Sequence, residues 1–447
     1  MTRRDFLKIS TAASLAVGGP FIGRAAGQAT ATEADPLAGA AERIERHRMR
    51  DAVIAVRGKG GRPWWGARVR VEQVRHEFLF GSNCFLFDRV PGADLAAAYK
   101  QRFAALCNEA TLGFYWAGFE PEEGKPDYAY TDRAVQWCRE HLITPKGHPL
   151  AWDHDVSSPK WLPPDLTEVG ELSADRVKEI VARYRGRIDL WDVVNEPRHL
   201  GNPQFRKEAR NHMAQWAASL GPFAYTAGHL KLARAANPQA QLTVNDYQFD
   251  AGYLALLESL KERGKFLFDV VGLQSHMHGG PWPLKRVWET CETYRVLGLP
   301  LHFTEMTVLS GPRLGPGEQW GPTEPGLEAK QAEYVEKLYT LLFSHPAVGA
   351  AIWWDLSDRA AWQRAAAGLL RQDMSPKPAY ERLHALIKGR WWTKASSETD
   401  ERGEFKLRVF RGLHKVTVTL PSGVDVSQVV NWDAKGAGRY EVTVPPA

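Results

Sequence analysis

Short apolar runs alternate with longer segments of helical periodicity between about residues 78 and 388 of this chain. The segments between the runs, such as 224–236 and 329–343, carry apolar residues at helical spacing. Strands that alternate with helices form a parallel sheet, and eight such units close it into a barrel. The pattern therefore predicts an α/β fold of the (β/α)8, or TIM barrel, type. The eight predicted strand cores are 78–81, 112–115, 144–150, 190–194, 242–245, 270–274, 299–303 and 350–354.

Both flanks of the predicted barrel show the alternating pattern of half-buried strands instead. On the amino-terminal side, 53–56 and 67–71 are joined by a glycine-rich turn, within 50–77. On the carboxyl-terminal side, 392–447 contains similar runs at 404–409, 415–419 and 440–444. Neither flank has enough apolar surface to be stable alone. We therefore predict that both pair into one small accessory β module beside the barrel.

Polar and aromatic side chains cluster where the predicted strands end. In a barrel, the carboxyl ends of all strands meet at one rim, which is where active sites lie. Two of these residues are acidic: Glu196 follows the fourth strand and Glu305 the seventh. The others expected at the rim are His148, Trp152, Asn195, Asn245, Gln274, His276 and Trp354.

Two carboxyl groups at one rim favour the hydrolysis of a glycoside. Retaining hydrolysis needs one carboxylic acid that protonates the leaving oxygen and one carboxylate that attacks the anomeric carbon, about 5–5.5 Å apart. In such a site Asn195 is expected to hydrogen-bond the 2-hydroxyl of the sugar, and His276 to orient an ionised Glu305. A single glutamate at a strand end is more often a solvated or salt-bridged carboxylate, and it is the combination of the two that favours catalysis.

Composition narrows the range of partners and cofactors. The net charge of +5 is spread along 447 residues without a long basic run, which argues against nucleic acid as a partner. Seventeen tryptophans are compatible with stacking on sugar rings, although most large aromatics belong to protein cores. His276 and His278 lack an evident third ligand, so no metal site and no cofactor are predicted. We expect a monomer that acts on a polysaccharide or oligosaccharide.

The amino terminus resembles a twin-arginine export signal over residues 1–31. Arg3 and Arg4 precede a modest apolar stretch, 9–22, which glycine and proline residues interrupt. This stretch is too short and too weakly apolar for a permanent membrane anchor, and small residues near 25–31 offer cleavage sites. We expect export by the twin-arginine machinery and a periplasmic or secreted protein. Because such cargo folds in the reducing cytoplasm, we expect free, mostly buried thiols at Cys84, Cys107, Cys138 and Cys291.

Seven ordered motifs, from about Phe78 to Leu386, resemble glycoside hydrolase family 10, the retaining endo-β-1,4-xylanases. They include Gly147-His148-Pro149-Leu150-Ala151-Trp152, the run Trp191 to Pro197, Asn245-Asp246-Tyr247, Gly272 to His276, Thr304-Glu305, and Trp354 to Asp358 with Trp362. The resemblance implies that Glu196 is the acid/base and Glu305 the nucleophile. It also implies that sugar-binding sites next to the cleaved bond are formed by His148, Trp152, Asn195, Gln274, His276, Trp354 and Trp362.

The chain departs from this family after the second strand, where members usually carry Glu-Asn-x-x-Lys-Trp. Trp116 is retained, but Tyr115 occupies the lysine place, Leu112 the asparagine place and Thr111 the glutamate place. Asp153 replaces a usual histidine and Asp355 a usual glycine. We expect Tyr115 and Trp116 still to contact substrate, with an altered groove. The alternatives are a retaining hydrolase of another β-linked or branched polysaccharide or small glycoside, and a non-catalytic carbohydrate-binding protein.

Overall fold

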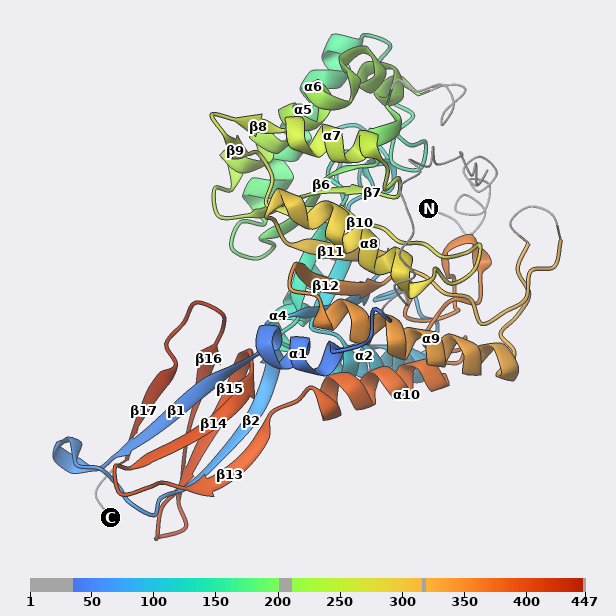
Figure 1. Ribbon diagram of the computed structural model, residues 1–447. Helices are drawn as coiled ribbons and strands as arrows, with labels where there is room; N and C mark the ends of the chain where they lie inside the picture. The colour runs from blue at the N-terminus through green and yellow to red at the C-terminus, as the bar shows by residue number, and fades with distance from the viewer. Residues whose placement is uncertain (1–34, 201–210, 316–318, 445–447) are drawn as a thin grey trace, which may run out of the picture.

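The computed structural model describes residues 35–200, 211–315 and 319–444, and its central feature is a closed barrel of eight parallel strands (Figure 1). The α/β barrel prediction is confirmed, because the strands close in the order β10-β11-β12-β3-β4-β5-β6-β7. Their bounds are β3 (Leu79–Asn83), β4 (Glu109–Gly113), β5 (Thr144–His148), β6 (Leu190–Asn195), β7 (Gln241–Asp246), β10 (Val270–Leu273), β11 (Leu301–Met306) and β12 (Val348–Trp353). Between β7 and β10 lies a small hairpin, β8 (Lys261–Glu262) with β9 (Lys265–Phe266).

The second barrel strand begins three residues earlier than its apolar pattern predicted. The predicted core was 112–115, whereas β4 is Glu109–Gly113. Glu109 is completely buried, and burial of a carboxyl group is rare without a compensating partner. The apolar pattern therefore did not reveal Glu109, a charged residue that faces the barrel interior. It also placed Phe114 and Tyr115 in the strand, although both follow β4.

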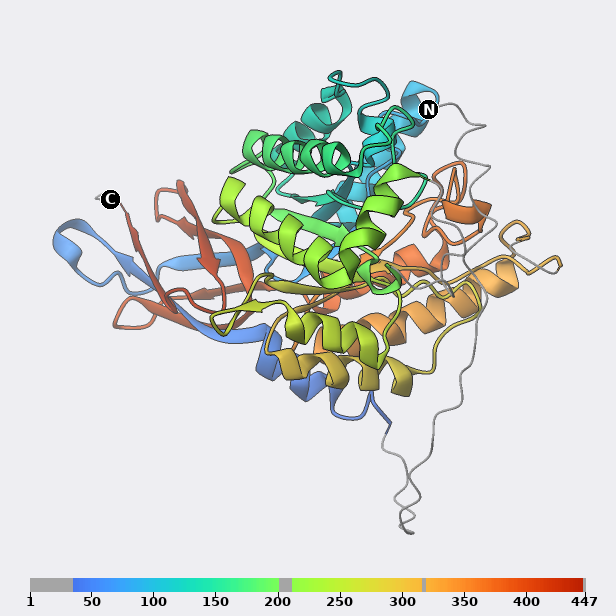
Figure 2. The ribbon, with the colours of Figure 1, turned by 90° about the horizontal axis from the view of Figure 1, so that it is seen from above.

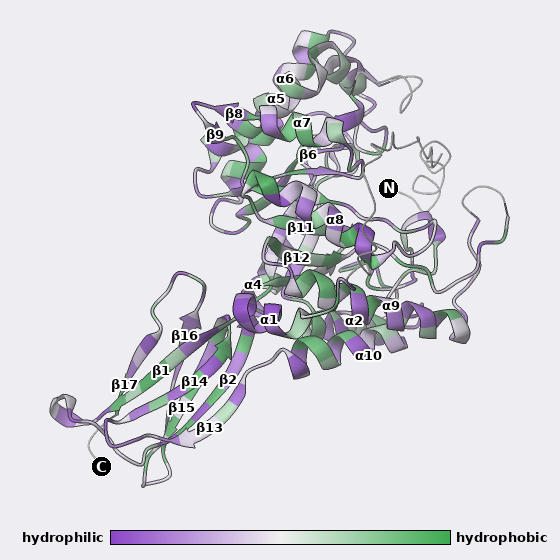
Figure 3. Ribbon diagram, in the orientation of Figure 1, coloured by the Kyte–Doolittle hydropathy of each residue, from purple (hydrophilic) through white to green (hydrophobic). Residues whose placement is uncertain are grey.

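Helices surround the barrel and cover its strands with one apolar face each. The predicted segments 224–236 and 329–343 lie within α6 and α9, and α6 continues across a bend at Gly221-Pro222. The helices carry hydrophilic as well as hydrophobic residues (Figure 3), as expected for elements with one face toward solvent. Their bounds are α2 (Ala93–Leu106), α3 (Trp116–Phe119), α4 (Ala129–Glu140), α5 (Leu166–Arg183), α6 (His212–Ala236), α7 (Ala251–Ser259), α8 (Leu284–Tyr294), α9 (Pro325–Ser344) and α10 (Pro378–Ala385).

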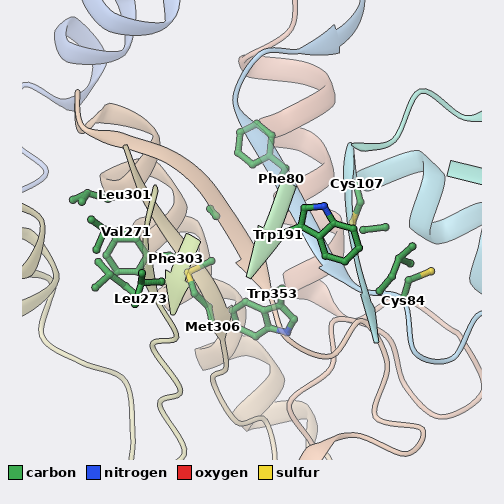
Figure 4. Packing of buried hydrophobic residues seen from close by; sticks show 14 of the residues in the cluster. Phe80, Cys84, Cys107, Trp191, Val271, Leu273, Leu301, Phe303, Met306 and Trp353 are labelled. Carbon is green, nitrogen blue, oxygen red and sulfur yellow. The ribbon is translucent and has the colours of Figure 1, made fainter. Parts of the chain in front are cut away.

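Large side chains fill the core that these helices and strands enclose (Figure 4). Phe80, Trp191 and Trp353 are at most 2% exposed. Trp191 can lie against β5 only because residue 147 is glycine, since a Cβ atom there would come within 2.1 Å of the indole. All four cysteines are buried free thiols, as predicted. No described helix is long and apolar enough to cross a bilayer.

The accessory β module is formed from both ends of the chain, as predicted, and projects from one side of the barrel (Figures 1 and 2). One sheet has the order β14-β1-β17 and the other β13-β2-β15-β16. Trp432 is completely buried between them. The strands are β1 (Met49–Arg57), β2 (Arg68–His76), β13 (Lys394–Glu398), β14 (Glu404–Phe410), β15 (Gly412–Thr419), β16 (Asp425–Trp432) and β17 (Arg439–Thr443).

The module meets the barrel at the amino ends of the barrel strands. Strand β2 ends at His76, just before β3 begins, and Arg75 donates a hydrogen bond to Thr144, the first residue of β5. The module therefore lies on the side opposite the carboxyl rim.

Helix α1 (Ala40–Arg48), which precedes β1, connects module and barrel through one buried arginine. The Arg48 guanidinium donates to the carbonyl oxygens of Phe343, His345 and Val348 at 2.6, 2.6 and 2.8 Å. These carbonyls lie at the end of α9 and the start of β12, where a helix leaves acceptors without partners inside the helix. Burial lowers the pKa of Arg48 to about 9.

We expect Arg48→Ala to lower the free energy of unfolding by about 2–4 kcal/mol, because hydrogen bonds to a charged group contribute about 1.5–3 kcal/mol and the buried carbonyls would lose their donors. Urea denaturation followed by tryptophan fluorescence measures the change. Arg46→Ala, on the same helix and more exposed, serves as the control. Equal stability of the two variants would show that Arg48 does not hold this junction.

Candidate active site

Glu196 and Glu305 both lie at the carboxyl rim of the barrel. Glu305 belongs to β11, and Glu196 directly follows β6. Glu305 is 4% exposed, whereas Glu196 is half-buried. Glu196 also has a left-handed backbone with φ of 57°, which costs a non-glycine residue energy and is frequent at functional sites. The two carboxyl groups therefore differ in environment: one is sealed within the rim and the other is accessible to solvent.

Glu305 receives a hydrogen bond on each carboxylate oxygen. The Asn245 amide donates to Oε1 at 2.7 Å, and the His276 ring donates to Oε2 at 3.0 Å. Burial alone would raise the pKa of Glu305, but the hydrogen bond from His276 and the nearby charges of His148, His276 and Lys146 lower it below its usual value. The site thus keeps Glu305 ionised.

A second layer of charge lies beneath Glu305, inside the barrel. His148 donates through Nδ1 to Asp192 at 2.8 Å, and its Nε2 lies 4.0 Å from Glu305 Oε1. Lys146 places its ammonium group 2.9 Å from the same Asp192 oxygen. Burial would raise the pKa of Asp192, but Lys146 and His148 lower it to about 2. Asp192 therefore stays anionic and fixes the His148 ring beside Glu305.

Glu196 is held by three donors. The side-chain amides of Asn195 and Gln274 donate to Oε1, each at 3.2 Å, and the Trp152 indole donates to Oε2 at 3.1 Å. Asn195 also accepts from Gln274 at 3.3 Å and from Asn245 at 2.8 Å. Because Asn245 contacts Glu305 as well, this amide network connects the two carboxyl groups and fixes their relative position.

Asn245 has a different role from the one expected, because it is completely buried. Its amide nitrogen donates to Asn195 and Glu305, and its oxygen accepts from Thr304 at 2.6 Å. With no surface left for a sugar, it orients other site residues and does not bind substrate.

Trp116 is not at the site either. It is 3% exposed, its indole donates to Glu120 at 2.8 Å, and its ring packs against Trp161 and the guanidinium of Arg176. The expectation that Trp116 contacts substrate is therefore wrong. Leu112, at the usual asparagine place, is also completely buried and cannot reach the groove.

The remaining predicted aromatics line the rim. Trp354 makes edge contacts with His148 and His276, at ring distances of 5.4 and 5.9 Å. Trp362 lies 4.4 Å from the His276 ring. Tyr115 lies 5.9 Å from Trp152 and 5.6 Å from His148. Eight predicted site residues thus surround Glu196 and Glu305: His148, Trp152, Asn195, Gln274, His276, Trp354, Trp362 and Tyr115.

Sequence reasoning missed several residues that support the site. Thr307 lies 2.9 Å from His276 Nδ1, so the ring is held on both sides. Lys146 and Asp192 fix His148 from below. Alternate residues of a strand share a face, so Lys146, two residues before His148, could have been recognised as facing the same side.

Glu109 completes this buried layer without forming part of the reactive pair. Thr111 donates to its Oε1 at 2.9 Å, while its Oε2 has no hydrogen-bond partner within the described ranges. Gly81 makes room for the carboxyl, because a Cβ atom there would come within 1.9 Å of Oε2. Burial raises the pKa of Glu109 to about 8, although Lys146 and Thr111 oppose the shift.

We expect wild type to lose stability at alkaline pH through ionisation of Glu109, and we expect Glu109→Gln to avoid this loss. The native carboxyl keeps its proton up to about pH 8, whereas an ordinary glutamate loses it near 4.5. Between these values the native state binds more protons than the unfolded state, so wild-type stability falls as pH rises, and glutamine cannot ionise. The melting temperature of the variant, relative to wild type, should therefore be higher at pH 9 than at pH 5. The prediction would be contradicted if the melting temperature relative to wild type were the same at both pH values. Glu122→Gln, at an exposed position, is the control.

Comparison with known proteins agrees with this geometry. The model of Glycosyl hydrolase family 10 matches residues 85–386. Endo-1,4-beta-xylanase 1 of Arabidopsis thaliana is 27% identical over 420 residues, which is 88% of this chain and 40% of the relative. Anti-sigma-I factor RsgI6 of Acetivibrio thermocellus is 25% identical over 90% of this chain and 49% of the relative. The chain therefore spans less than half of these curated relatives.

Solved structures share the fold. Xylanase 10B of Thermotoga petrophila RKU-1 in complex with xylobiose has a TM-score of 0.58 at 22% identity, covering 70% of this chain and 95% of that one. A GH10 structure from Paenibacillus barcinonensis has a TM-score of 0.59, also at 22% identity, over 70% and 96%. Since the family model matches most of the chain and the two glutamates lie at the rim of a closed barrel, this chain belongs to glycoside hydrolase family 10.

Proposed function

We propose that this protein is a retaining hydrolase of β-1,4-linked xylose chains, similar in its chemistry to endo-β-1,4-xylanases. The observation that carries the proposal is the contrast between Glu305, buried with a donor on each oxygen and a lowered pKa, and Glu196, half-buried at the open side of the rim. One carboxylate is prepared to attack and the other can exchange protons with the leaving group and with water.

In the first step of this mechanism, a Glu305 oxygen bonds to the anomeric carbon while the glycosidic C–O bond breaks. The proton of Glu196 passes to the leaving oxygen. In the second step a water molecule attacks the anomeric carbon, its proton passes to Glu196, and the ester bond to Glu305 breaks. Two inversions give net retention.

The surrounding side chains position these two groups. Asn245 and His276 hold the Glu305 carboxylate, and the amides of Asn195 and Gln274 hold Glu196. Pre-aligned groups of this kind lower the barrier because no reorientation is needed during the reaction. Trp354 and Trp362 supply indole surfaces for the apolar faces of sugar rings.

Xylan as the substrate rests on the relatives named endo-1,4-beta-xylanase and on family membership. The test is the release of reducing sugar from linear xylan, branched xylans, other β-glucans and aryl β-glycosides, with product anomers followed by proton NMR. We expect hydrolysis of β-xylosidic bonds with retained configuration. Hydrolysis of another glycan alone would mean that the enzyme is specific for that glycan and not for xylan. No hydrolysis of any of these substrates would favour a carbohydrate-binding protein.

We also propose that the protein is exported in folded form by the twin-arginine route. This rests on the sequence around Arg3 and Arg4, in residues that lie outside the described ranges. The four buried free thiols are compatible with folding in a reducing compartment. Replacing both arginines by lysine should retain the protein in the cytoplasm, measured by cell fractionation.

A further inference from the structure

Four aromatic rings at one side of the candidate active site form a closed set of edge-to-face contacts. The ring centroids are 5.8 Å apart for Phe85 and Tyr115 and 5.6 Å apart for Tyr115 and His148. They are 5.4 Å apart for His148 and Trp354, and 5.5 Å apart for Trp354 and Phe85, which closes the set. The interplanar angles lie between 75° and 90°. Aromatic pairs favour this geometry, so the four rings, which we call the aromatic wall, support one another.

The backbone around the aromatic wall lets its rings approach. Phe85 follows β3, Tyr115 follows β4, His148 ends β5 and Trp354 follows β12. Gly113 allows Phe85 to lie against the end of β4, because a Cβ atom at 113 would come within 3.3 Å of the Phe85 ring and 3.5 Å of Tyr115. Residues from four strands are thus brought together at one arc of the rim.

The position of Glu196 shows which part of a substrate this arc would meet. Glu196 follows β6, and β12 lies four strands away around the eight-stranded barrel. The acid must contact the leaving oxygen and the nucleophile the anomeric carbon. The leaving group therefore lies toward β6, and the sugar that stays on the enzyme extends toward the arc formed by β12, β3 and β4.

Three polar groups beside the aromatic wall already bond to one another. Asn83 donates to Asp355 Oδ1 at 3.2 Å, and the backbone nitrogen of Trp362 donates to Oδ2 at 3.0 Å. The Tyr115 hydroxyl, by contrast, has no hydrogen-bond partner in the part of the chain that the structure describes. Burial, together with the charges of Glu305, Glu196 and Asp355, raises the pKa of Tyr115, so its hydroxyl remains a neutral donor close to the reactive pair.

We infer that the retained side of the substrate is recognised through a single sugar unit, with Tyr115 and Phe85 as specificity-determining residues. This inference rests on the proposed function of the same site. The Tyr115 hydroxyl donates to the sugar attached to Glu305. The Phe85 ring closes the cleft beyond that sugar, where a second unit would meet an apolar ring and polar groups that are already paired.

The test compares nitrophenyl β-xyloside with nitrophenyl β-xylobioside, which share one leaving group and differ by one retained sugar. We expect kcat/KM for the xylobioside to exceed that for the xyloside by less than about tenfold, or to fall below it, because a second sugar held by several hydrogen bonds would raise kcat/KM by more than that. Tyr115→Phe should lower kcat/KM for both substrates alike. Phe85→Ala should raise the relative rate on the xylobioside, while Phe266→Ala, in the β8–β9 hairpin, should leave the ratio unchanged.

A preference above about tenfold for the xylobioside in wild type, or a Tyr115→Phe effect confined to that substrate, would overturn the inference. If neither substrate is hydrolysed, the proposed function fails, and binding still decides the inference. Calorimetric titration of wild type with the same two nitrophenyl glycosides should then show the xylobioside bound at most about tenfold more tightly than the xyloside, whereas much tighter binding of the xylobioside would refute single-sugar recognition.

Discussion

Glu305→Gln should lower kcat on xylan and on aryl xylosides by more than about 10⁴-fold, as for removal of other essential nucleophiles. Glutamine has the size of glutamate, so it can still accept from Asn245 or His276. Its amide oxygen cannot form the glycosyl ester, and it removes the negative charge that stabilises the positive anomeric carbon in the transition state. Substrate affinity should change much less than kcat, which steady-state kinetics separates from binding measured by calorimetry.

The matched control for Glu305→Gln is Glu262→Gln. Glu262 is an exposed residue of the β8–β9 hairpin, and its carboxylate pairs with Lys231. It should keep full activity. A second preparation excludes contamination by wild-type enzyme. If Glu305→Gln then keeps more than about one hundredth of the wild-type activity, another group attacks the anomeric carbon.

Glu196→Ala should have an effect that depends on the leaving group. General acid catalysis contributes about 10²–10⁴-fold, so hydrolysis of natural xylosidic bonds should fall by that factor. A dinitrophenolate leaves without a proton, so formation of the glycosyl ester from a dinitrophenyl xyloside should be nearly unaffected. The loss of the general base then slows the second step, and the ester should accumulate as a burst of dinitrophenol.

Azide provides the diagnostic measurement for Glu196→Ala. As a nucleophile that needs no general base, it should restore turnover of the dinitrophenyl substrate and yield a xylosyl azide of retained configuration. Trp152→Phe removes only one donor to Glu196 and should show a smaller loss and no azide rescue. A loss that is the same for all leaving groups, with no response to azide, would assign Glu196 to substrate positioning.

The barrel was predictable because its signal is repeated eight times. Each buried parallel strand reads as an apolar run, and an error of three residues in one strand does not change the number of strands. The accessory module was predictable as a pairing of both termini, since neither half could bury its strands alone. The burial of Trp432 was not predictable, because which face of a strand is covered depends on the partner sheet.

The two glutamates were predictable from their places after strands, but the roles of their neighbours were not. Asn245 and Trp116 occupy motif positions, yet both are buried. Asn245 orients other site residues, and Trp116 packs away from the site. Glu109 and Lys146 were overlooked because charged residues are rarely buried, and only the folded barrel brings them together. Phe85 was missed because an isolated phenylalanine carries no sequence signal, and its ring contacts come from residues that follow two other strands, β4 and β12.

The most direct measurement is mass spectrometry of the protein after incubation with a dinitrophenyl 2-deoxy-2-fluoro-β-xyloside. The fluorine slows both steps, and the good leaving group keeps the first step fast enough for the glycosyl ester to accumulate. We expect one sugar per protein, carried on the peptide that contains Glu305, and none on Glu305→Gln. A sugar attached to another residue, or turnover of the normal substrate with inverted configuration and no adduct, would refute Glu305 as the nucleophile.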